Sequence, residues 1–131
     1  MGLSVWKAAE IAAKVAETSN AQKYRLGAVS VRRKEILSVG ANMMVYPLAD
    51  NVRGLHAEEN AIRRVEDPVG INLVVVRIGW TGNWLLARPC DNCWDLICKT
   101  GVRRVFYSID NHHLGAEWVN RKLPKRILEA G

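Results

Sequence analysis

Residues with the donor atoms that zinc prefers stand in two short polar clusters of the sequence. The first is "HAE" at residues 56–58, and the second is "PCDNC" at residues 89–93. Zinc in proteins takes imidazole nitrogen and thiolate sulfur in a tetrahedral arrangement. Two cysteines three positions apart face the same way in a first helical turn. The sequence therefore predicts a zinc site made by His56, Cys90 and Cys93.

Three protein ligands leave a fourth position for water, which distinguishes a catalytic zinc from a closed structural one. The remaining cysteine, Cys98, lies among apolar residues and is expected to be a buried small side chain. A bound zinc lowers the pKa of its water to about 7 and so supplies hydroxide at neutral pH. Because Glu58 is only two residues from His56, it is predicted to move protons at that water without holding the metal.

Each cluster taken alone also has a structural explanation. A histidine at the start of a helix often packs or caps, and an isolated C-x-x-C is common. The two clusters together are more specific, because each opens an expected helix and they stand about thirty residues apart. We therefore favour a catalytic zinc site over a polar helix start.

The elements that must position these clusters follow from apolar periodicity, turn residues and helix stops. The pattern predicts, in order, a helix over 4–18, strands over 26–33 and 35–43 joined as a hairpin, a helix over 57–66, a strand over 71–78, a helix over 90–100, a strand over 102–109, and a last helix over 115–129 that is broken at Pro124.

Strands that alternate with helices in the second half imply parallel crossover connections. The predicted fold class is therefore α/β, a three-layer α/β/α sandwich around a mixed sheet of about five strands if residues 85–87 are strand-like. A chain of 131 residues is close to the common size of one domain, so residues 1–131 are expected to form a single domain.

Composition and charge limit the class of protein. The net charge is +6, which fits an anionic partner such as a nucleotide or a nucleic acid. The basic residues are scattered in pairs, so a solvated basic surface is the alternative. No apolar run approaches a membrane helix, the N-terminus lacks a secretory signal, and three cysteines argue against a disulfide framework. A cytoplasmic protein without a membrane partner is expected.

The pattern H-x-E followed by P-C-x-x-C resembles the signature of the zinc-dependent cytidine deaminase superfamily. The resemblance extends from "LGAVSV" to "VFYSI", and "HAEENAI" is most similar to the CMP/dCMP deaminase type. It implies that His56, Cys90 and Cys93 hold Zn²⁺. It also implies that Glu58 carries the water's proton to the base ring and to the leaving amine, and that ammonia is released. Asn60 is expected to brace the local backbone.

Four residues are predicted to contact the substrate. The segment "SVGANM" resembles the one whose asparagine contacts sugar or base, which assigns that role to Asn42, with a turn-capping side chain as the alternative. Ala57 lies between the expected ligand and the carboxylate. Arg88 departs from the family pattern and either meets a phosphate or lies on the surface. Trp84 either stacks on a base or, as tryptophan more often does, packs in the core.

These observations favour a hydrolytic deaminase of a small-molecule cytosine nucleoside or nucleotide. The alternative is a nucleic-acid deaminase that acts on cytosine in single strands or on adenosine in RNA, which the charge, the tryptophans and the basic C-terminal segment support. A non-catalytic zinc domain is disfavoured because it would not need Glu58. A homo-oligomer is expected, with Arg53 and residues 110–120 as candidates to complete the rim of the site. His112 and His113 are expected to be solvated.

Overall fold

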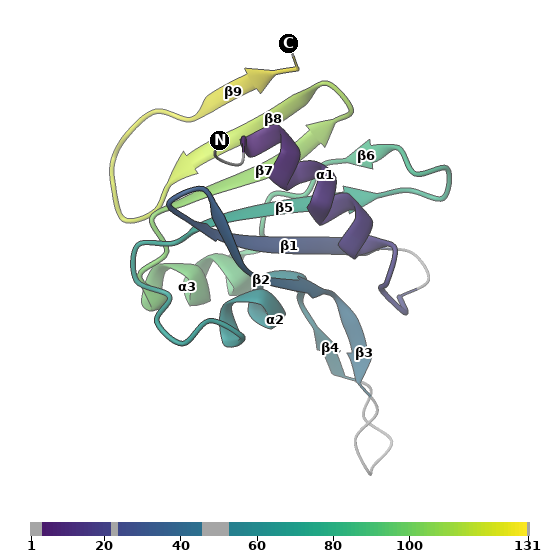
Figure 1. Ribbon diagram of the computed structural model, residues 1–131, viewed down its shortest axis with the longest axis horizontal. Helices are drawn as coiled ribbons and strands as arrows, with labels where there is room; N and C mark the ends of the chain where they lie inside the picture. The colour runs from purple at the N-terminus through teal and green to yellow at the C-terminus, as the bar shows by residue number, and fades with distance from the viewer. Residues whose placement is uncertain (1–3, 22–23, 46–52, 131) are drawn as a thin grey trace.

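The computed structural model of the chain describes residues 4–21, 24–45 and 53–130. Three helices and nine strands follow one another along these residues (Figure 1). Their order is α1 Val5–Ala16, β1 Arg25–Arg32, β2 Glu35–Ala41, β3 Met43–Val45, β4 Arg53–Leu55, α2 Ala57–Arg63, β5 Asn72–Ile78, β6 Trp84–Leu85, α3 Asp91–Thr100, β7 Arg104–Asp110, β8 His113–Trp118 and β9 Arg126–Glu129.

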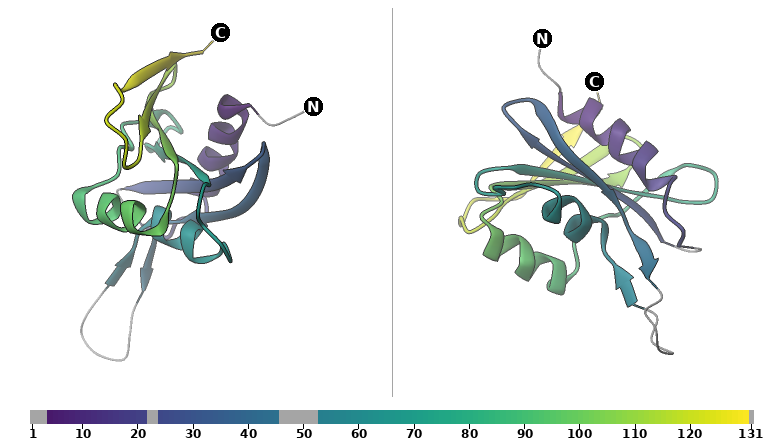
Figure 2. Two further views of the ribbon diagram at one scale, coloured as in Figure 1. Left: turned by 90° about the vertical axis from the view of Figure 1, so that its left-hand side faces the viewer. Right: turned by 60° about the horizontal axis from the view of Figure 1, so that its bottom comes forward.

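The centre of the fold is a mixed sheet of seven strands in the order β2-β1-β5-β7-β8-β9, with β6 paired to β5. The β5–β7 pair is parallel, as the crossover through α3 requires, and the other pairs are antiparallel. Helix α1 covers one face of the sheet, and α2 and α3 cover the other (Figure 2). The predicted three-layer α/β/α sandwich is confirmed.

Helix α1 begins where Ser4 caps it, since the Ser4 hydroxyl accepts a hydrogen bond from the Lys7 backbone N–H at 3.1 Å. The helix presents small buried side chains to the sheet: Ala8, Ala9, Ala12 and Ala16. The backbones approach so closely that a Cβ on Gly27 of β1 would lie 2.0 Å from the Ala12 carbonyl oxygen. Only glycine fits at that position of the strand.

Helix α2 is seated against β2 in a similar way. A Cβ added to Gly40 would lie 2.6 Å from the Ala61 backbone nitrogen, so the helix packs directly on the strand. The buried Asn60 amide donates to the Ala41 carbonyl at 2.9 Å and its oxygen accepts from Arg64 Nε at 3.0 Å. Asn60 therefore braces the local backbone, as predicted, and fixes the start of α2 relative to the sheet.

The hairpin of β1 and β2 turns through two residues, Arg33 and Lys34. Arg32 pairs with Glu35 across the turn, and both turn residues have positive φ angles, 52° and 64°. Positive φ at both central positions matches the right-handed twist of the strands, as in a type I′ turn. The predicted hairpin is confirmed.

The prediction of a last helix over 115–129 is wrong. These residues form most of β8 and β9, which extend the sheet beyond β7. Alternate residues of β8 face opposite sides of the sheet. Ala116 packs on the side covered by α1, whereas Glu117, which pairs with Val105 of β7, faces the side covered by α2 and α3. The helix-forming residues of this segment are overridden by pairing with β7, because packing on a half-buried surface outweighs local propensity. The sheet is correspondingly larger than five strands.

The remaining predictions concern a membrane partner and the residues that could complete the rim of the site. No helix among the described residues is long and apolar enough to cross a membrane. Arg53 begins β4, but its side chain lies outside the described part. The segment 110–120 lies mainly in β8, between β7 and β9. A homo-oligomer remains a prediction.

Candidate metal centre and substrate pocket

The predicted zinc ligands come together at the N-termini of two helices. Cys93 Sγ lies 3.1 Å from His56 Nδ1, and Cys90 Sγ lies 3.9 Å from the same nitrogen. The three donor atoms are all within 4.8 Å of one another. A tetrahedral ion with ligands at about 2.0–2.3 Å separates its donors by about 3.3–3.8 Å. The donor set therefore fits zinc, and the two distances from His56 Nδ1 lie on either side of the tetrahedral range.

The helix starts explain why these side chains are free to converge. His56 is the N-cap residue of α2 and Cys90 is the N-cap residue of α3, each with extended backbone. Neither side chain makes the capping hydrogen bond that this position usually provides. The two side chains instead approach each other, with Cys90 Sγ 3.9 Å from His56 Nδ1, which argues against an ordinary polar helix start.

Glu58 lies in the first turn of α2 and is only 3% exposed. Desolvation by burial raises the pKa of its carboxyl, while its own backbone N–H, the neighbouring His56 and the Cys93 thiol oppose the shift. A carboxyl with a raised pKa is better suited to take up and release a proton near neutral pH. Its position fits the predicted proton-transfer role, which remains a prediction.

The surroundings of Cys93 disfavour its thiolate form when no cation is present. Burial raises the pKa of the Cys93 thiol far above its usual range, and the negative charges of Glu58 and Cys90 raise it further. The lowering expected from a helix N-terminus is thus outweighed in the chain alone. A divalent cation at the three donors would reverse the balance, because it stabilises thiolate directly. The electrostatics of the cluster therefore agree with its geometry.

A pocket of about 350 Å³ opens onto the metal ligands. This is the size of a small-molecule site. Most of its wall is apolar. The lining residues are Tyr24, Leu26, Asn42, Met43, Leu55, His56, Ala57, Glu58, Arg77, Leu86, Ala87, Arg88 and Cys90. The structure thus brings six of the eight predicted site residues to the wall and buries a seventh, Cys93, beside them.

Asn42 lines this pocket, but its amide group already has partners. Its Oδ1 accepts a hydrogen bond from the Leu26 N–H at 2.8 Å, and its Nδ2 donates to the Tyr24 carbonyl. The side chain therefore links the end of β2 to the start of β1 and shapes the pocket wall. This is close to the capping role considered as the alternative, and substrate contact remains a prediction.

Arg88 is held by an ion pair that the sequence did not reveal. Its Nε and Nη2 donate to the two carboxylate oxygens of Glu117 at 2.7 and 3.1 Å. The Tyr107 hydroxyl donates to the same carboxylate at 2.7 Å. The guanidinium hydrogen bond is the main cause that lowers the pKa of Glu117. Arg88 is therefore at the pocket but its charge is largely neutralised.

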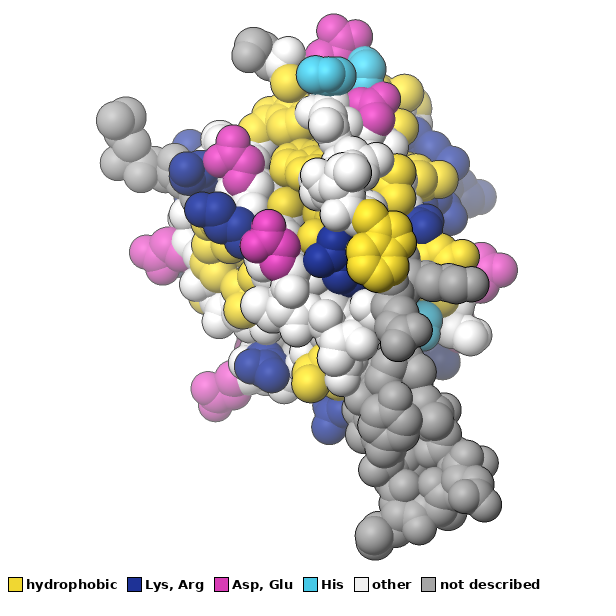
Figure 3. Space-filling view, turned by 90° about the vertical axis from the view of Figure 1, so that its right-hand side faces the viewer, with side chains coloured by type: hydrophobic (Ala, Val, Ile, Leu, Met, Phe, Trp, Pro, Cys, Tyr) yellow, Lys and Arg dark blue, Asp and Glu magenta, His cyan; other side chains and the backbone are white. Residues whose placement is uncertain are grey.

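Arg77 is the charged residue of the pocket wall that the sequence analysis did not predict. It stands near the end of β5, and its guanidinium carbon lies 4.3 Å from the centre of the exposed Tyr24 ring. It forms no ion pair with a carboxylate among the described residues, and its buried Nε has no hydrogen-bond partner there. Figure 3 looks onto this end of the sheet, where basic and hydrophobic side chains adjoin. One sequence signal for Arg77 was available, the alternation of side chains within the strand "VVVRI". This alternation places Arg77 on the same face of the sheet as Val75, which belongs to the core beneath α2.

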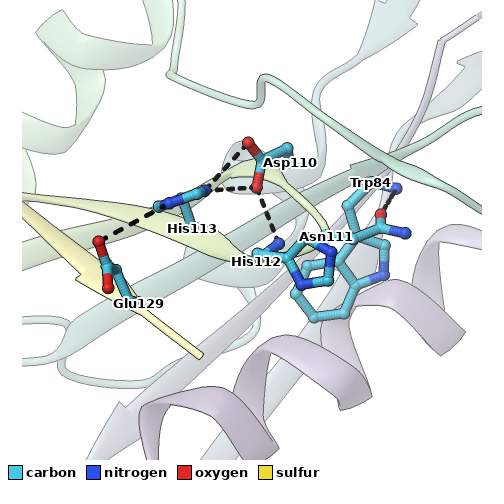
Figure 4. Close-up of polar contacts among 6 residues, drawn as sticks. All are labelled: Trp84, Asp110, Asn111, His112, His113 and Glu129. Carbon is cyan, nitrogen blue, oxygen red and sulfur yellow. Dashed lines mark hydrogen bonds and ion pairs between the residues drawn. The ribbon is translucent and has the colours of Figure 1, made fainter. Parts of the chain in front are cut away.

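Trp84 is not brought to the pocket. Its ring stacks on Trp6 of α1, with centroids 6.2 Å apart, and packs with the core on the α1 face of the sheet. Its backbone N–H donates to Asn111 Oδ1 (Figure 4). The metal ligands lie on the opposite face, with α2 and α3. The core packing considered as the alternative is therefore what the structure shows.

The two adjacent histidines also lie apart from the metal centre. His113 Nδ1 is 2.8 Å from Asp110 Oδ1, and His113 Nε2 is 4.0 Å from a carboxylate oxygen of Glu129 (Figure 4). The His112 backbone N–H donates to Asp110 at 2.8 Å and is the main cause that lowers the pKa of this carboxyl. These contacts join the β7–β8 turn to β9.

Comparison with known proteins agrees with this site. The family model described as the cytidine and deoxycytidylate deaminase zinc-binding region matches residues 5–109. An uncharacterized deaminase encoded in the luxG 3′ region of Aliivibrio fischeri is 28% identical over 105 residues. That match spans 72% of this chain and 65% of the relative, just under two thirds of its length.

Solved structures have the same fold. The apo dCMP deaminase of the cyanophage S-TIM5 superposes with a TM-score of 0.65 at 25% identity, and the match covers 80% of this chain and 82% of that one. The same phage enzyme in complex with dCMP and dUMP has a TM-score of 0.60 at 24% identity, with 76% of each chain covered. Cytidine deaminase from Burkholderia pseudomallei has a TM-score of 0.61 at 16% identity, over 97% of this chain and 93% of that one.

Proposed function

Because the chain belongs to the cytidine and deoxycytidylate deaminase family, we propose that it catalyses the hydrolytic deamination of a cytosine nucleoside or nucleotide and releases ammonia. The observation that carries this proposal is the buried carboxylate of Glu58 in the same pocket as the convergent donors of His56, Cys90 and Cys93. A ligand triad with a proton-transfer group beside it is what hydrolysis of an amino group on a base requires.

The proposed chemistry divides between the metal and the chain. Zinc held by His56, Cys90 and Cys93 supplies Lewis-acid activation of water at neutral pH. A carboxylate oxygen of Glu58 would accept one proton of the attacking water and deliver it to the base ring, where it stays. It would then carry the second proton, from the hydroxyl group now on the carbon, to the leaving amino group. The carbon that carried the amino group gains the water's oxygen, and the bond to nitrogen breaks as ammonia leaves. Water is consumed, so no oxidant or reductant is needed.

The pocket wall supports a flat base as the reacting group. Leu26, Leu55 and Ala57 present apolar atoms, which favour an aromatic ring over bulk water. Asn42 is held in place by hydrogen bonds to the backbone of Tyr24 and Leu26. It is proposed to orient the base or sugar through the second hydrogen of Nδ2 and the second lone pair of Oδ1. These contacts would place the amino-bearing carbon near Glu58.

The charge in the pocket favours a nucleotide over a nucleoside. Arg88 is neutralised by Glu117, whereas Arg77 has no carboxylate partner among the described residues. Guanidinium groups bind phosphate oxygens through paired hydrogen bonds. The related phage enzyme was crystallised with dCMP and dUMP. We therefore propose that Arg77 binds the phosphate of a cytosine nucleotide.

Ammonia release over a panel of substrates tests this proposal. The panel contains cytidine, deoxycytidine, CMP, dCMP, guanine, adenosine and short oligonucleotides, and the zinc content of the purified protein is measured in parallel. We expect activity on cytosine nucleotides. Activity confined to oligonucleotides would instead support the nucleic-acid deaminase considered from the sequence. Zinc-loaded protein with no activity on any cytosine compound would overturn the proposal.

A further inference from the structure

A second group of arginines surrounds Trp118 at the opposite end of the sheet from the pocket. The guanidinium carbons of Arg103, Arg104 and Arg121 lie 5.1, 4.5 and 5.3 Å from the Trp118 ring centre. They come from the start of β7 and from the segment after β8. The left view of Figure 2 looks onto this end of the molecule. We call these three arginines and Trp118 the Trp118 surface.

The Trp118 surface carries positive charge without internal compensation. None of its arginines forms an ion pair with Asp or Glu within residues 4–21, 24–45 and 53–130. Burial, followed by the positive charges of Arg126 and Arg103, lowers the pKa of Arg104. Like charges gathered in this way repel one another. An anionic partner would remove that repulsion.

The arrangement suits a polymer better than a single small anion. The basic side chains continue along an exposed track, through Lys122 and Lys125 to Arg126 at the start of β9. No pocket described in the structure is lined by the three arginines of the surface. Phosphates of a nucleic acid chain offer fixed charges at regular spacing, and arginine binds each through two hydrogen bonds.

We propose that the Trp118 surface binds the phosphate backbone of single-stranded nucleic acid. Its position separates this binding from the deaminase chemistry. The surface lies where the parallel strands β5 and β7 begin, whereas the pocket includes Arg77 near the end of β5. Across the seven residues of β5 the two ends are about 20 Å apart. The proposal therefore does not depend on the proposed function.

Binding of a fluorescent oligothymidylate of about twenty nucleotides, followed by anisotropy as salt rises from about 50 to 200 mM, tests the proposal. Thymine has no amino group, so the probe is not a deaminase substrate. We expect the parent protein to bind with a steep salt dependence. Arg103→Gln with Arg121→Gln should weaken binding about tenfold at low salt and reduce the slope of log K against log salt by about 1.4, for two lost phosphate contacts.

The matched control is Lys14→Gln with Arg63→Gln, two exposed residues on α1 and α2. It lowers the net charge equally but leaves the Trp118 surface intact, so its binding should stay within about twofold of the parent. Melting temperatures of both double variants confirm that they fold. Absence of probe binding by the parent would overturn the proposal. So would equal losses in the two double variants, or displacement of the probe by polyglutamate as readily as by unlabelled oligothymidylate, which would indicate an acidic protein partner.

Discussion

Glu58 is buried beside the candidate ligands His56 and Cys93 and is not part of their donor cluster, so we predict that metal binding and proton transfer are separable by mutation. Glu58→Gln keeps the size of the side chain but removes its ability to accept a proton. Turnover on the best cytosine substrate should fall by about 10⁴-fold, the upper end for general acid–base groups, because one carboxylate serves both steps. Ammonia release and zinc content measure the two effects.

His56→Ala provides the comparison for Glu58→Gln. It removes a donor atom, so we expect loss of zinc together with loss of activity. Glu58→Gln should keep zinc and a melting temperature close to the parent. Full turnover by Glu58→Gln, or zinc loss as complete as in His56→Ala, would contradict the assigned roles.

Arg77 gives a second prediction at the scale of one side chain. Arg77→Gln removes the uncompensated charge that lines the pocket. The kcat/KM for dCMP should fall by about 10–100-fold, since a hydrogen bond to a charged group contributes about 1.5–3 kcal/mol, while that for deoxycytidine changes little. Arg63→Gln, at an exposed position of α2, is the charge-matched control. Equal losses on both substrates would mean that Arg77 does not select phosphate.

At the scale of the elements, the Glu117 carboxylate of β8 accepts hydrogen bonds from Tyr107 of β7 and from Arg88, which lies in the segment before α3. Burial, with the hydrogen bond to Glu117, raises the pKa of Tyr107 to about 12. The folded protein therefore favours the protonated phenol. This contribution to stability is complete below the ordinary tyrosine pKa of about 10 and is lost as pH rises from there to about 12.

Tyr107→Phe tests this contribution. At pH 8 the variant should be less stable by about 1 kcal/mol, because Glu117 loses one donor in the interior. Between pH 10 and 12 its stability should fall less than that of the parent, since phenylalanine does not ionise. Urea unfolding at several pH values measures both. Parallel declines above pH 10 would show that Tyr107 is not the group that titrates.

The elements near the site were predictable because their signals are local. Residue types and the three-residue spacing of Cys90 and Cys93 indicate the candidate ligands. Gly101 ends α3 as predicted, whereas α2 ends at Arg63, three residues before the predicted end. The segment 115–129 was not predictable in this way, because its strands depend on pairing with β7 rather than on its own helix-forming residues.

Side-chain partners of the pocket also lay beyond the sequence. The Arg88–Glu117 ion pair joins residues 29 positions apart, and no local pattern indicates it. Trp84 faces α1 because of the pairing of β6 with β5, which sequence alone does not specify. The partners of the pocket side chains therefore could not be predicted without the three-dimensional fold, whereas the candidate metal ligands could.

For the molecule as a whole, zinc would join two helices that are separated along the chain. His56 and Cys93 are 37 residues apart in sequence, so a bound ion closes a long loop and binds only the folded state. Removal of zinc by a strong chelator should lower the melting temperature by at least about 5 °C. Differential scanning calorimetry with and without chelator measures the shift.

The cysteines provide the controls for this experiment. Cys98 is not in the cluster, so Cys98→Ser should keep the chelator effect. Cys93→Ser should begin with a lower melting temperature and respond little to chelator. If chelator leaves the parent unchanged, the His–Cys–Cys cluster does not contribute zinc-dependent stability.

The turn at Arg33 and Lys34 could be stabilised further, and it lies at the opposite end of β1 from the substrate pocket. Both turn residues have positive φ angles, a backbone conformation that asparagine and glycine adopt at lower energy than arginine and lysine. Arg33→Asn with Lys34→Gly should therefore raise the free energy of unfolding by about 1 kcal/mol, measured by urea denaturation, and a lower value would show that the turn is relaxed as it stands. A chain with this higher free energy of unfolding would tolerate destabilising substitutions better. Substitutions in the pocket that weaken packing could then be assayed for chemistry alone, without the loss of folded protein that otherwise obscures such measurements.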